Sequence, residues 1–173
     1  CGKLTTDFLE KLKSFVKEQK YKVTWIIDTH VHADHITGIS ALKKVFPDAQ
    51  SGIGIGIKDS IERFAGVFCD QTTPRDGSLF DRLFKDGDEF ELGKLRAQVL
   101  ATPGHTPGCV TYYVGGCAFV GDTIFMPDSG SARCDFPGGS AEQLWDSIHG
   151  KLFKLPPSTK IYVGHDYGAD GKR

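Results

Sequence analysis

Three histidines and an aspartate follow an apolar segment in the first fifth of the chain. Val23–Ile27 is predicted to be a buried strand, and His30, His32, Asp34 and His35 come directly after it. Because alternate residues of an extended chain point to the same side, the first two imidazoles share one direction. The other two residues fall where the chain turns toward the next predicted helix. Imidazole and carboxylate ligands suit zinc or iron, so the pattern predicts a metal site at a strand end.

Three further short motifs place ligand-type residues at the ends of predicted strands. His105 lies in the turn Pro-Gly-His-Thr-Pro-Gly, Asp122 follows the strand Cys117–Val120, and His165 follows the strand Lys160–Val163. Each motif alone is weak, since a Gly-Asp-Thr is usually only a turn. Together they supply a second set of ligands that can converge on the same strand ends.

Helices and strands alternate along the chain, which favours a layered α/β or α+β domain. His149 lies on the predicted helix over Ala141–Phe153 and is therefore expected to be a surface or packing residue. Helices are predicted over Thr5–Lys20, Ile36–Phe46, Ile61–Phe68 and Ala141–Phe153, and strands over Val23–Ile27, Ser51–Ile57, Glu89–Leu92, Leu95–Leu100, Val110–Val114, Cys117–Val120 and Lys160–Val163.

The glycines of the segment Gly52–Gly56 invite a dinucleotide-binding interpretation. The segment lacks the G-x-G-x-x-G spacing and opens no convincing long helix, so a glycine-rich strand packed against a neighbour is the better interpretation. Five scattered cysteines form no C-x-x-C pair, which argues against a disulfide framework and suits a reducing compartment. Cys69, Cys109 and Cys117 are expected to be small buried residues.

Composition excludes two classes of partner. The chain has 173 residues and a formal net charge of −1, with 21 basic against 22 acidic side chains, so a nucleic-acid partner is not expected. No stretch approaches the roughly 18 uninterrupted apolar residues of a membrane-spanning helix. One domain is the default for this length.

The ordered motifs H-x-H-x-D-H, G-H-T-P-G, G-D-T and G-H-D resemble the metallo-β-lactamase superfamily from about Val23 to Tyr167. The resemblance implies an α+β fold, an αββα sandwich, with the metal site at one edge between the sheets. Residues 1–173 then form a single domain of this type. Members of the superfamily begin with strands before the first helix and continue past the last histidine motif. We therefore expect the domain to be partial, without these N-terminal strands and this C-terminal extension.

The resemblance also implies a ligand set. All seven ligand positions of the superfamily's binuclear members are present: His30, His32 and His105 for one metal, Asp34, His35 and His165 for the other, and Asp122 as the bridge.

Other positions separate the branches of the superfamily. True β-lactamases usually carry a cysteine in place of Asp122, and flavodiiron proteins carry a glutamate in place of His32. Hydroxyacylglutathione hydrolases (glyoxalase II) typically read G-H-E-Y where this chain reads Gly-His-Asp-Tyr over 164–167. This motif, His-Ile-Thr-Gly over 35–38 and Ser-Ala-Arg-Cys-Asp-Phe over 131–136 are similar to the persulfide dioxygenase branch.

That branch implies one Fe(II) per chain, held by His30, His105 and Asp122, which would be the catalytic residues. The remaining ligand-type residues would orient the ligands and tune the metal: His32, Asp34, His35 and His165. The implied reaction is the oxidation of glutathione persulfide by O₂ to sulfite and glutathione. Two alternatives remain open. One is a glyoxalase II-like thioester hydrolase with two zinc ions or an iron–zinc pair, and the other is a non-catalytic metal-binding or partner-binding protein.

Two further residues are candidates for binding substrate. Arg133 could clamp a glutathione carboxylate or form an ion pair with a nearby aspartate within its loop, and Tyr167 could donate a hydrogen bond or only pack. Dimers are common in the resembled family, so a homodimer stays open. The resemblance implies a bacterial cytoplasm or a mitochondrial matrix as compartment, and no targeting signal is visible.

Overall fold

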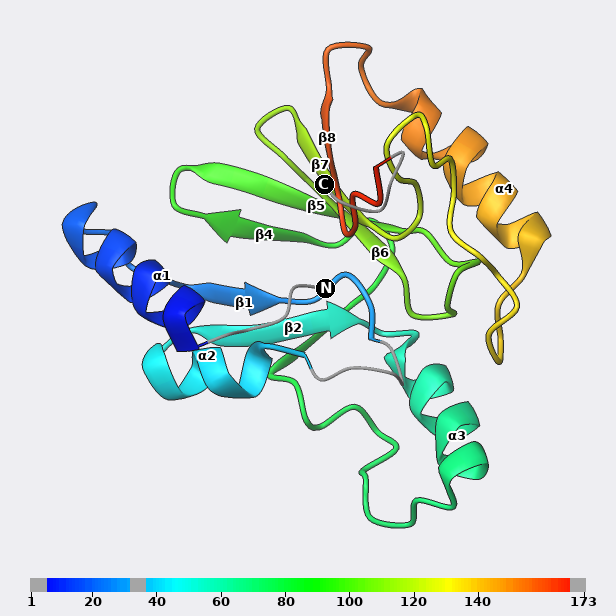
Figure 1. Cartoon of the computed structure of the whole chain (residues 1–173), viewed down its shortest axis with the longest axis horizontal. Helices are drawn as coiled ribbons and strands as arrows, with labels where there is room; N and C mark the ends of the chain where they lie inside the picture. Colours follow the sequence, from blue (N-terminus) through cyan, green and yellow to red (C-terminus); the bar gives the residue numbers. More distant parts are fainter. Residues whose placement is uncertain (1–5, 32–36, 169–173) are drawn as a thin grey trace.

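The computed structural model describes residues 6–31 and 37–168 (Figure 1). The helices are α1 (Thr6–Glu18), α2 (Ile39–Val45), α3 (Ile57–Phe68) and α4 (Ala141–Gly150), followed by a 3₁₀ turn (Leu152–Lys154). The strands are β1 (Trp25–Ile27), β2 (Gln50–Gly54), β3 (Arg82–Phe84), β4 (Glu89–Leu92), β5 (Leu95–Ala101), β6 (Val110–Val114), β7 (Cys117–Gly121) and β8 (Lys160–Val163). In these ranges, no helix has the length and apolar character needed to cross a membrane.

The strands form two sheets. One has three parallel strands in the order β1-β2-β3, and the other has five strands in the order β4-β5-β6-β7-β8. The five-stranded sheet is antiparallel as far as β7, and β8 then pairs with β7 in parallel. Consequently β5, β7 and β8 all end at the same edge of the sheet, where β6 begins.

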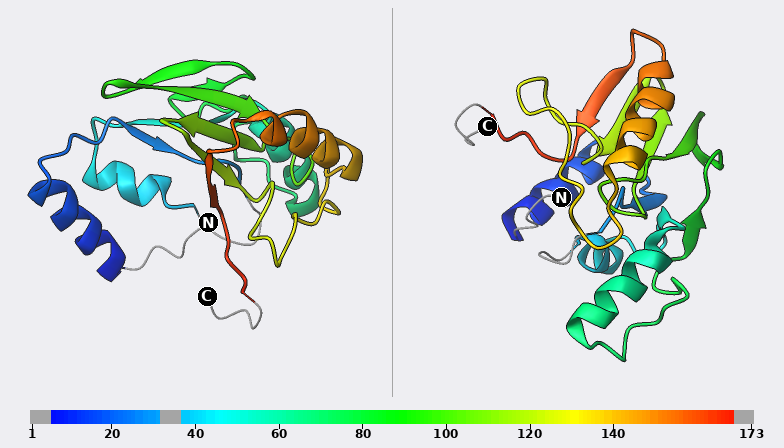
Figure 2. Two further views of the ribbon diagram at one scale, coloured as in Figure 1. Left: turned by 90° about the horizontal axis from the view of Figure 1, so that it is seen from above. Right: turned by 90° about the vertical axis from the view of Figure 1, so that its right-hand side faces the viewer.

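Three clusters of buried side chains define the layers. Between the sheets, Phe84 of β3 packs against Phe90 of β4 and Tyr112 of β6, with ring centroids 5.0 and 5.8 Å away. A second cluster joins Ile26 of β1 to Ile39 of α2. A third joins β7 to the 3₁₀ turn after α4, and in the right-hand view of Figure 2 α4 lies beside β7 and β8. The expected αββα sandwich is confirmed.

The glycine-rich strand β2 packs closely against residues of both sheets, in agreement with the predicted strand packed against a neighbour. A Cβ atom on Gly52 would lie 2.5 Å from the ring of Phe84, and one on Gly54 would lie 2.5 Å from Cγ1 of Val110. Since real Cβ atoms do not approach other atoms this closely, a side chain at Gly52 would displace the core ring of Phe84, and one at Gly54 would displace Val110 of the other sheet. The glycines therefore serve packing between the layers.

The structure corrects two predicted boundaries and adds one strand. The expected extended segment over 51–57 ends at Gly54, and Ile57 begins α3 instead. The helix predicted to reach Phe153 stops at Gly150, because Lys151 leaves helical geometry (φ −124°, ψ −60°) before the 3₁₀ turn. Strand β3 was not predicted, since three residues are too few to show an alternating pattern, and its pairing with β2 defines it.

Candidate metal centre

Four side chains with metal-binding chemistry lie near the ends of strands from both sheets. His30 follows β1, Asp122 comes directly after β7, and His165 comes two residues after β8. His105 lies in the turn between β5 and β6. The strand pairing brings these separate segments to one edge of the sandwich, so the convergence that the motifs predicted is present for these four residues. His32, Asp34 and His35 lie outside the described residues.

One carboxylate oxygen lies close to three imidazoles. Oδ2 of Asp122 is 3.4 Å from Nε2 of His30, 3.5 Å from Nε2 of His165 and 3.8 Å from Nε2 of His105. The ligand atoms of His30, His105 and Asp122 all lie within 4.8 Å of one another, and these three residues are at most 3% exposed. The side chain of His165 is more open, at 29% exposure.

The opposite ring nitrogens of two histidines are held by neighbouring oxygens. Nδ1 of His105 lies 2.7 Å from the carbonyl oxygen of Arg133, and because a carbonyl only accepts, Nδ1 carries the hydrogen. Nε2 is then left with a lone pair directed at the centre. Oγ1 of Thr29 lies 3.0 Å from Nδ1 of His30 and can accept a hydrogen bond in the same way.

This donor set fits a transition-metal ion. Ligand atoms bound to one ion at about 2.0–2.2 Å lie roughly 3–3.6 Å apart. The separation of 3.4 Å between His30 and Asp122 is in that range, and the 3.8 Å between His105 and Asp122 needs only a small adjustment. A buried carboxylate is costly without a compensating charge, which a divalent cation supplies. Two imidazoles and one carboxylate are also the ligand types of non-haem iron sites that keep open positions.

Another carboxyl lies two residues before His30. Burial raises the pKa of Asp28 to about 6, an effect that a hydrogen bond from Thr37 partly offsets. The backbone of the same residue receives a hydrogen bond of 2.9 Å from the hydroxyl of Tyr112, a residue of the core between the sheets. The turn that leads into the candidate centre is thus attached to the five-stranded sheet.

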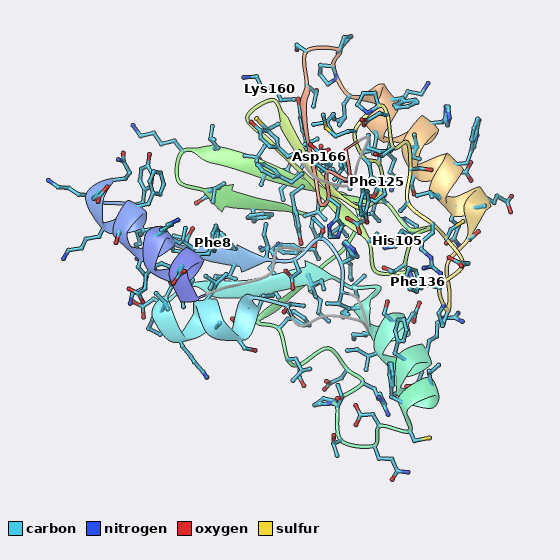
Figure 3. All side chains as sticks on the ribbon, in the orientation of Figure 1. Phe8, His105, Phe125, Phe136, Lys160 and Asp166 are labelled. Atoms are coloured by element: carbon cyan, nitrogen blue, oxygen red, sulfur yellow. The ribbon has the colours of Figure 1, made fainter. Side chains whose placement is uncertain are left out.

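A pocket of about 450 Å³ opens onto the centre. Its wall includes His105, Asp122 and His165, so a bound molecule could reach the ligand atoms directly. The other lining residues are mainly aromatic or small and polar: Phe125, Ser129, Ser131, Ala132, Arg133, Phe136 and Tyr167. Figure 3 shows His105 and Phe136 close together, and their ring centroids are 5.3 Å apart.

Arg133 forms the ion pair that was one of its two predicted roles. Its guanidinium donates two hydrogen bonds to Asp135, at 2.6 and 2.7 Å, and lies 4.6 Å from the ring centre of Phe136. Hydrogen bonds from Arg133 hold the pKa of Asp135 at about 2, well below its usual range. Arg133 also lines the pocket, so its ion pair with Asp135 leaves it within reach of a bound molecule.

Tyr167 belongs to an aromatic group on the other side of the pocket. Its ring stacks on His165 with centroids 5.5 Å apart and meets Phe125 edge-on at 5.2 Å. Packing, one of the two predicted roles of Tyr167, is therefore present in the structure. About half of the residue's surface remains exposed, and the residue lines the pocket. Phe125 and Phe136 were not predicted as site residues, although Phe136 ends the motif over 131–136 that follows Asp122.

His149 lies outside the centre, as predicted, and one cysteine differs from its predicted burial. His149 is exposed on α4 and stacks on Trp145 with ring centroids 3.8 Å apart. Among the described cysteines none forms a disulfide. Cys109 is buried, which raises the pKa of its thiol to about 11. Cys69, expected to be a small buried residue, is exposed, because it caps α3 with a left-handed φ of 52°.

Comparisons with known proteins agree with this geometry. A family model described as the metallo-beta-lactamase superfamily matches residues 5–165. Glyoxylase B2 of Dictyostelium discoideum is 48% identical over 168 residues, which cover 96% of this chain and 57% of that protein. The mitochondrial persulfide dioxygenase ETHE1 of Bos taurus is 37% identical over 154 residues, which cover 88% of this chain and 52% of the relative.

A solved structure also resembles the whole described fold. The crystal structure of ETHE1 from Myxococcus xanthus has a TM-score of 0.73 and 32% sequence identity, and covers 96% of this chain and 64% of that one. The chain thus spans a little over half of the two relatives named above, 57% and 52% of their lengths.

Proposed function

The chain belongs to the metallo-beta-lactamase superfamily, and we propose that it acts as an Fe(II)-dependent persulfide dioxygenase that oxidises glutathione persulfide with O₂ to sulfite and glutathione. The relatives named persulfide dioxygenase, in sequence and in structure, support this assignment. The observation that carries it is the buried group of His30, His105 and Asp122. This group offers two imidazoles and one carboxylate, and the pocket opens onto it.

In this proposal the three residues would hold one iron, which supplies open coordination positions for O₂ and for the persulfide sulfur. The chain's own contribution is to orient the ligands and to contact the substrate. Because Nδ1 of His105 donates its hydrogen to the carbonyl oxygen of Arg133, Nε2 carries no hydrogen and can face the metal. The rings of Phe125, Phe136 and Tyr167 line the pocket and would pack against the substrate. Water, which the balanced reaction consumes together with O₂, would reach the sulfur from the solvent.

The remaining residues of the predicted set receive supporting roles. We assign His32, Asp34, His35 and His165 to orienting the ligands rather than to a second metal. The separation of 3.5 Å between His165 and Oδ2 of Asp122 suits a hydrogen bond that holds the carboxylate in place after a small adjustment. Arg133 and Tyr167 would contact the glutathione part of the substrate, and Asp135 would hold the guanidinium in position.

A binuclear thioester hydrolase of the glyoxalase II type is the second candidate. The relative at 48% identity carries the name Glyoxylase B2. His165 lies as close to Asp122 as His30 does, at 3.5 against 3.4 Å, so a second ion could share the aspartate. In that case His165 would be a metal ligand, which gives the two candidates different expectations for the same residue.

Metal content and two activity assays separate the candidates. The chain is loaded anaerobically with Fe(II), and bound metal is counted for the wild type and for His165→Ala. A persulfide dioxygenase should bind one iron in both proteins, consume O₂ when glutathione persulfide is added, and leave S-lactoylglutathione intact. Two metals in the wild type, one in His165→Ala, and hydrolysis of S-lactoylglutathione would instead establish the hydrolase. A chain that binds metal but shows neither activity would contradict both.

A further inference from the structure

Three threonines form a continuous line of hydrogen bonds inside the five-stranded sheet. Oγ1 of Thr123 donates to Oγ1 of Thr102 at 3.1 Å, and Oγ1 of Thr102 lies 3.2 Å from Oγ1 of Thr111. All three side chains are completely buried, with an exposure of 0%. Thr102 is the shared member of both bonds, so the line depends on its hydroxyl.

Two of the threonines belong to segments that carry a candidate metal ligand, and the third lies in a strand that is bonded to another such segment. Thr123 follows Asp122 directly, and Thr102 lies three residues before His105 at the end of β5. Thr111 lies in β6 next to Val110, whose N–H donates to the carbonyl oxygen of Thr29 at 2.9 Å. Thr29 is the residue before His30, and its own hydroxyl lies 3.0 Å from the imidazole of His30. The hydroxyl bond between Thr102 and Thr123 therefore joins two ligand-bearing segments, and Thr111 extends the line into the strand whose backbone is bonded to the third.

We propose that the hydroxyl line Thr123–Thr102–Thr111 positions the ligands of the metal centre by setting the spacing between these segments. The inference rests on the proposed metal centre and adds residues that do not touch the metal. They are positioning residues, because they act through the backbone on His105, Asp122 and His30.

The chemistry of the site explains why hydroxyls are needed at these places. Valine has nearly the same shape as threonine and would fill the same space in a buried sheet, but it offers no directed bond. Hydrogen bonds restrict both distance and direction, whereas apolar contacts tolerate sliding. Ligands must be held within about 0.5 Å of their productive positions, so a directed link between the β5 and β7 ends is useful where dispersion contacts alone would not suffice.

Two of the threonines, Thr102 and Thr123, also have a further backbone restraint that keeps the line in register. The N–H of Thr102 donates to the carbonyl of Cys109 at 2.9 Å, which closes the turn that carries His105. The N–H of Thr123 donates to the carbonyl of Val120 at 3.1 Å, which forms the turn that carries Asp122. The side-chain bond between Thr102 and Thr123 thus joins two turns that are already shaped by their own backbones.

The test is a Co(II) titration followed by absorption spectroscopy, because cobalt reports ligand geometry without requiring turnover. Thr102→Val removes both bonds at nearly constant volume. We expect its dissociation constant for Co(II) to rise by about 10–100-fold, the range typical of losing a group that orients ligands. The visible bands should change in position or intensity. Thr102→Ser, which keeps the hydroxyl, should restore most of the affinity and the wild-type spectrum.

Two further variants keep the inference falsifiable. Val99→Ala opens a cavity in the same strand, at a residue that is also fully buried, and controls for loss of stability alone. It should leave the Co(II) affinity and spectrum unchanged. Thr111→Val breaks only one of the two bonds and should give a smaller effect than Thr102→Val, and it serves as the test if the latter does not fold.

The outcomes distinguish this inference from the proposed function. Thr102→Val or Thr111→Val with wild-type affinity and spectrum would overturn the positioning role while leaving the metal centre intact. An equal loss of affinity in Val99→Ala would overturn it as well, since the effect would then follow stability. A wild-type chain that binds no Co(II) would overturn the metal centre, and the positioning role with it.

Discussion

Gly164 lies against the carboxylate of Asp122 with no room for a side chain between them. A Cβ atom on Gly164 would overlap Oδ1 of Asp122 and would also lie 3.0 Å from the backbone carbon of Gly121. The N–H of Gly164 donates to the carbonyl of Gly121 at 2.7 Å, which holds the two strand ends together. The glycine that precedes His165 therefore lets β8 approach the residue most central to the candidate metal centre.

Gly164→Ala should weaken metal binding. The new methyl group would displace either the carboxylate of Asp122 or the end of β8, and both movements change the spacing of the ligands. We expect the dissociation constant for Co(II) to rise by at least about tenfold, as for other changes next to ligands. Gly150→Ala is the matched control, because nothing lies within 4 Å of its added Cβ. Wild-type affinity in Gly164→Ala would show that the site adapts to the side chain.

Asp122→Ala should abolish metal binding. The variant removes the carboxylate that lies within 4.8 Å of both His30 and His105 and leaves two imidazoles without a negative ligand. Metal content after loading and desalting measures the effect. His149→Ala, which changes an exposed histidine on α4, should retain the wild-type content. Full metal content in Asp122→Ala would place the binding site elsewhere.

Phe84→Ala should destabilise the fold by about 3–5 kcal/mol, the usual range for deleting a fully buried phenylalanine. Its ring is 0% exposed and lies in the core between the two sheets. Urea unfolding monitored by circular dichroism measures the change. Leu79→Ala, at a side chain that is 57% exposed, should change the free energy of unfolding by less than about 0.5 kcal/mol. Similar losses in both variants would contradict the assigned core.

Asp81 should contribute stability that depends on pH. Hydrogen bonds from the backbone of Ser51, from Lys43 and from the hydroxyl of Ser51 lower its pKa from 3.8 to about 2. Because the folded pKa is the lower one, the contribution is complete above about pH 4 and disappears as the pH falls through 2. Asp81→Asn should therefore be less stable than the wild type at pH 6, and the difference should shrink toward pH 2. The side chain is 47% exposed, so the contribution is reduced by solvent screening.

Urea unfolding of both proteins between pH 2 and pH 6 measures that difference. Asp48→Asn is a suitable comparison, as it changes an exposed aspartate in the turn before β2. A constant gap between the wild type and Asp81→Asn across this range would contradict the linkage. A gap that widens on acidification would contradict its sign.

Much of the fold could be predicted because it is encoded locally. The strands over Val110–Val114 and Cys117–Val120 were predicted, and the two glycines between them, 115 and 116, adopt positive φ in the hairpin that joins β6 to β7. Segments with little local pattern were misplaced. β3 consists of three residues whose strand character arises only from pairing with β2. Ile57 begins a helix, because a turn over 55–56 ends the extended segment at Gly54.

The amino-acid sequence by itself determined the ligand types, their places at strand ends and the superfamily, since motifs and periodicity are properties of neighbouring residues. Only the tertiary structure decided which ligands meet. Packing of the two sheets across Phe84 brings His30 of one sheet to His105 and Asp122 of the other. The register of β5, β6 and β7 within the five-stranded sheet aligns the buried threonines. Distances between segments far apart in the chain depend on how the layers pack, which no local pattern specifies.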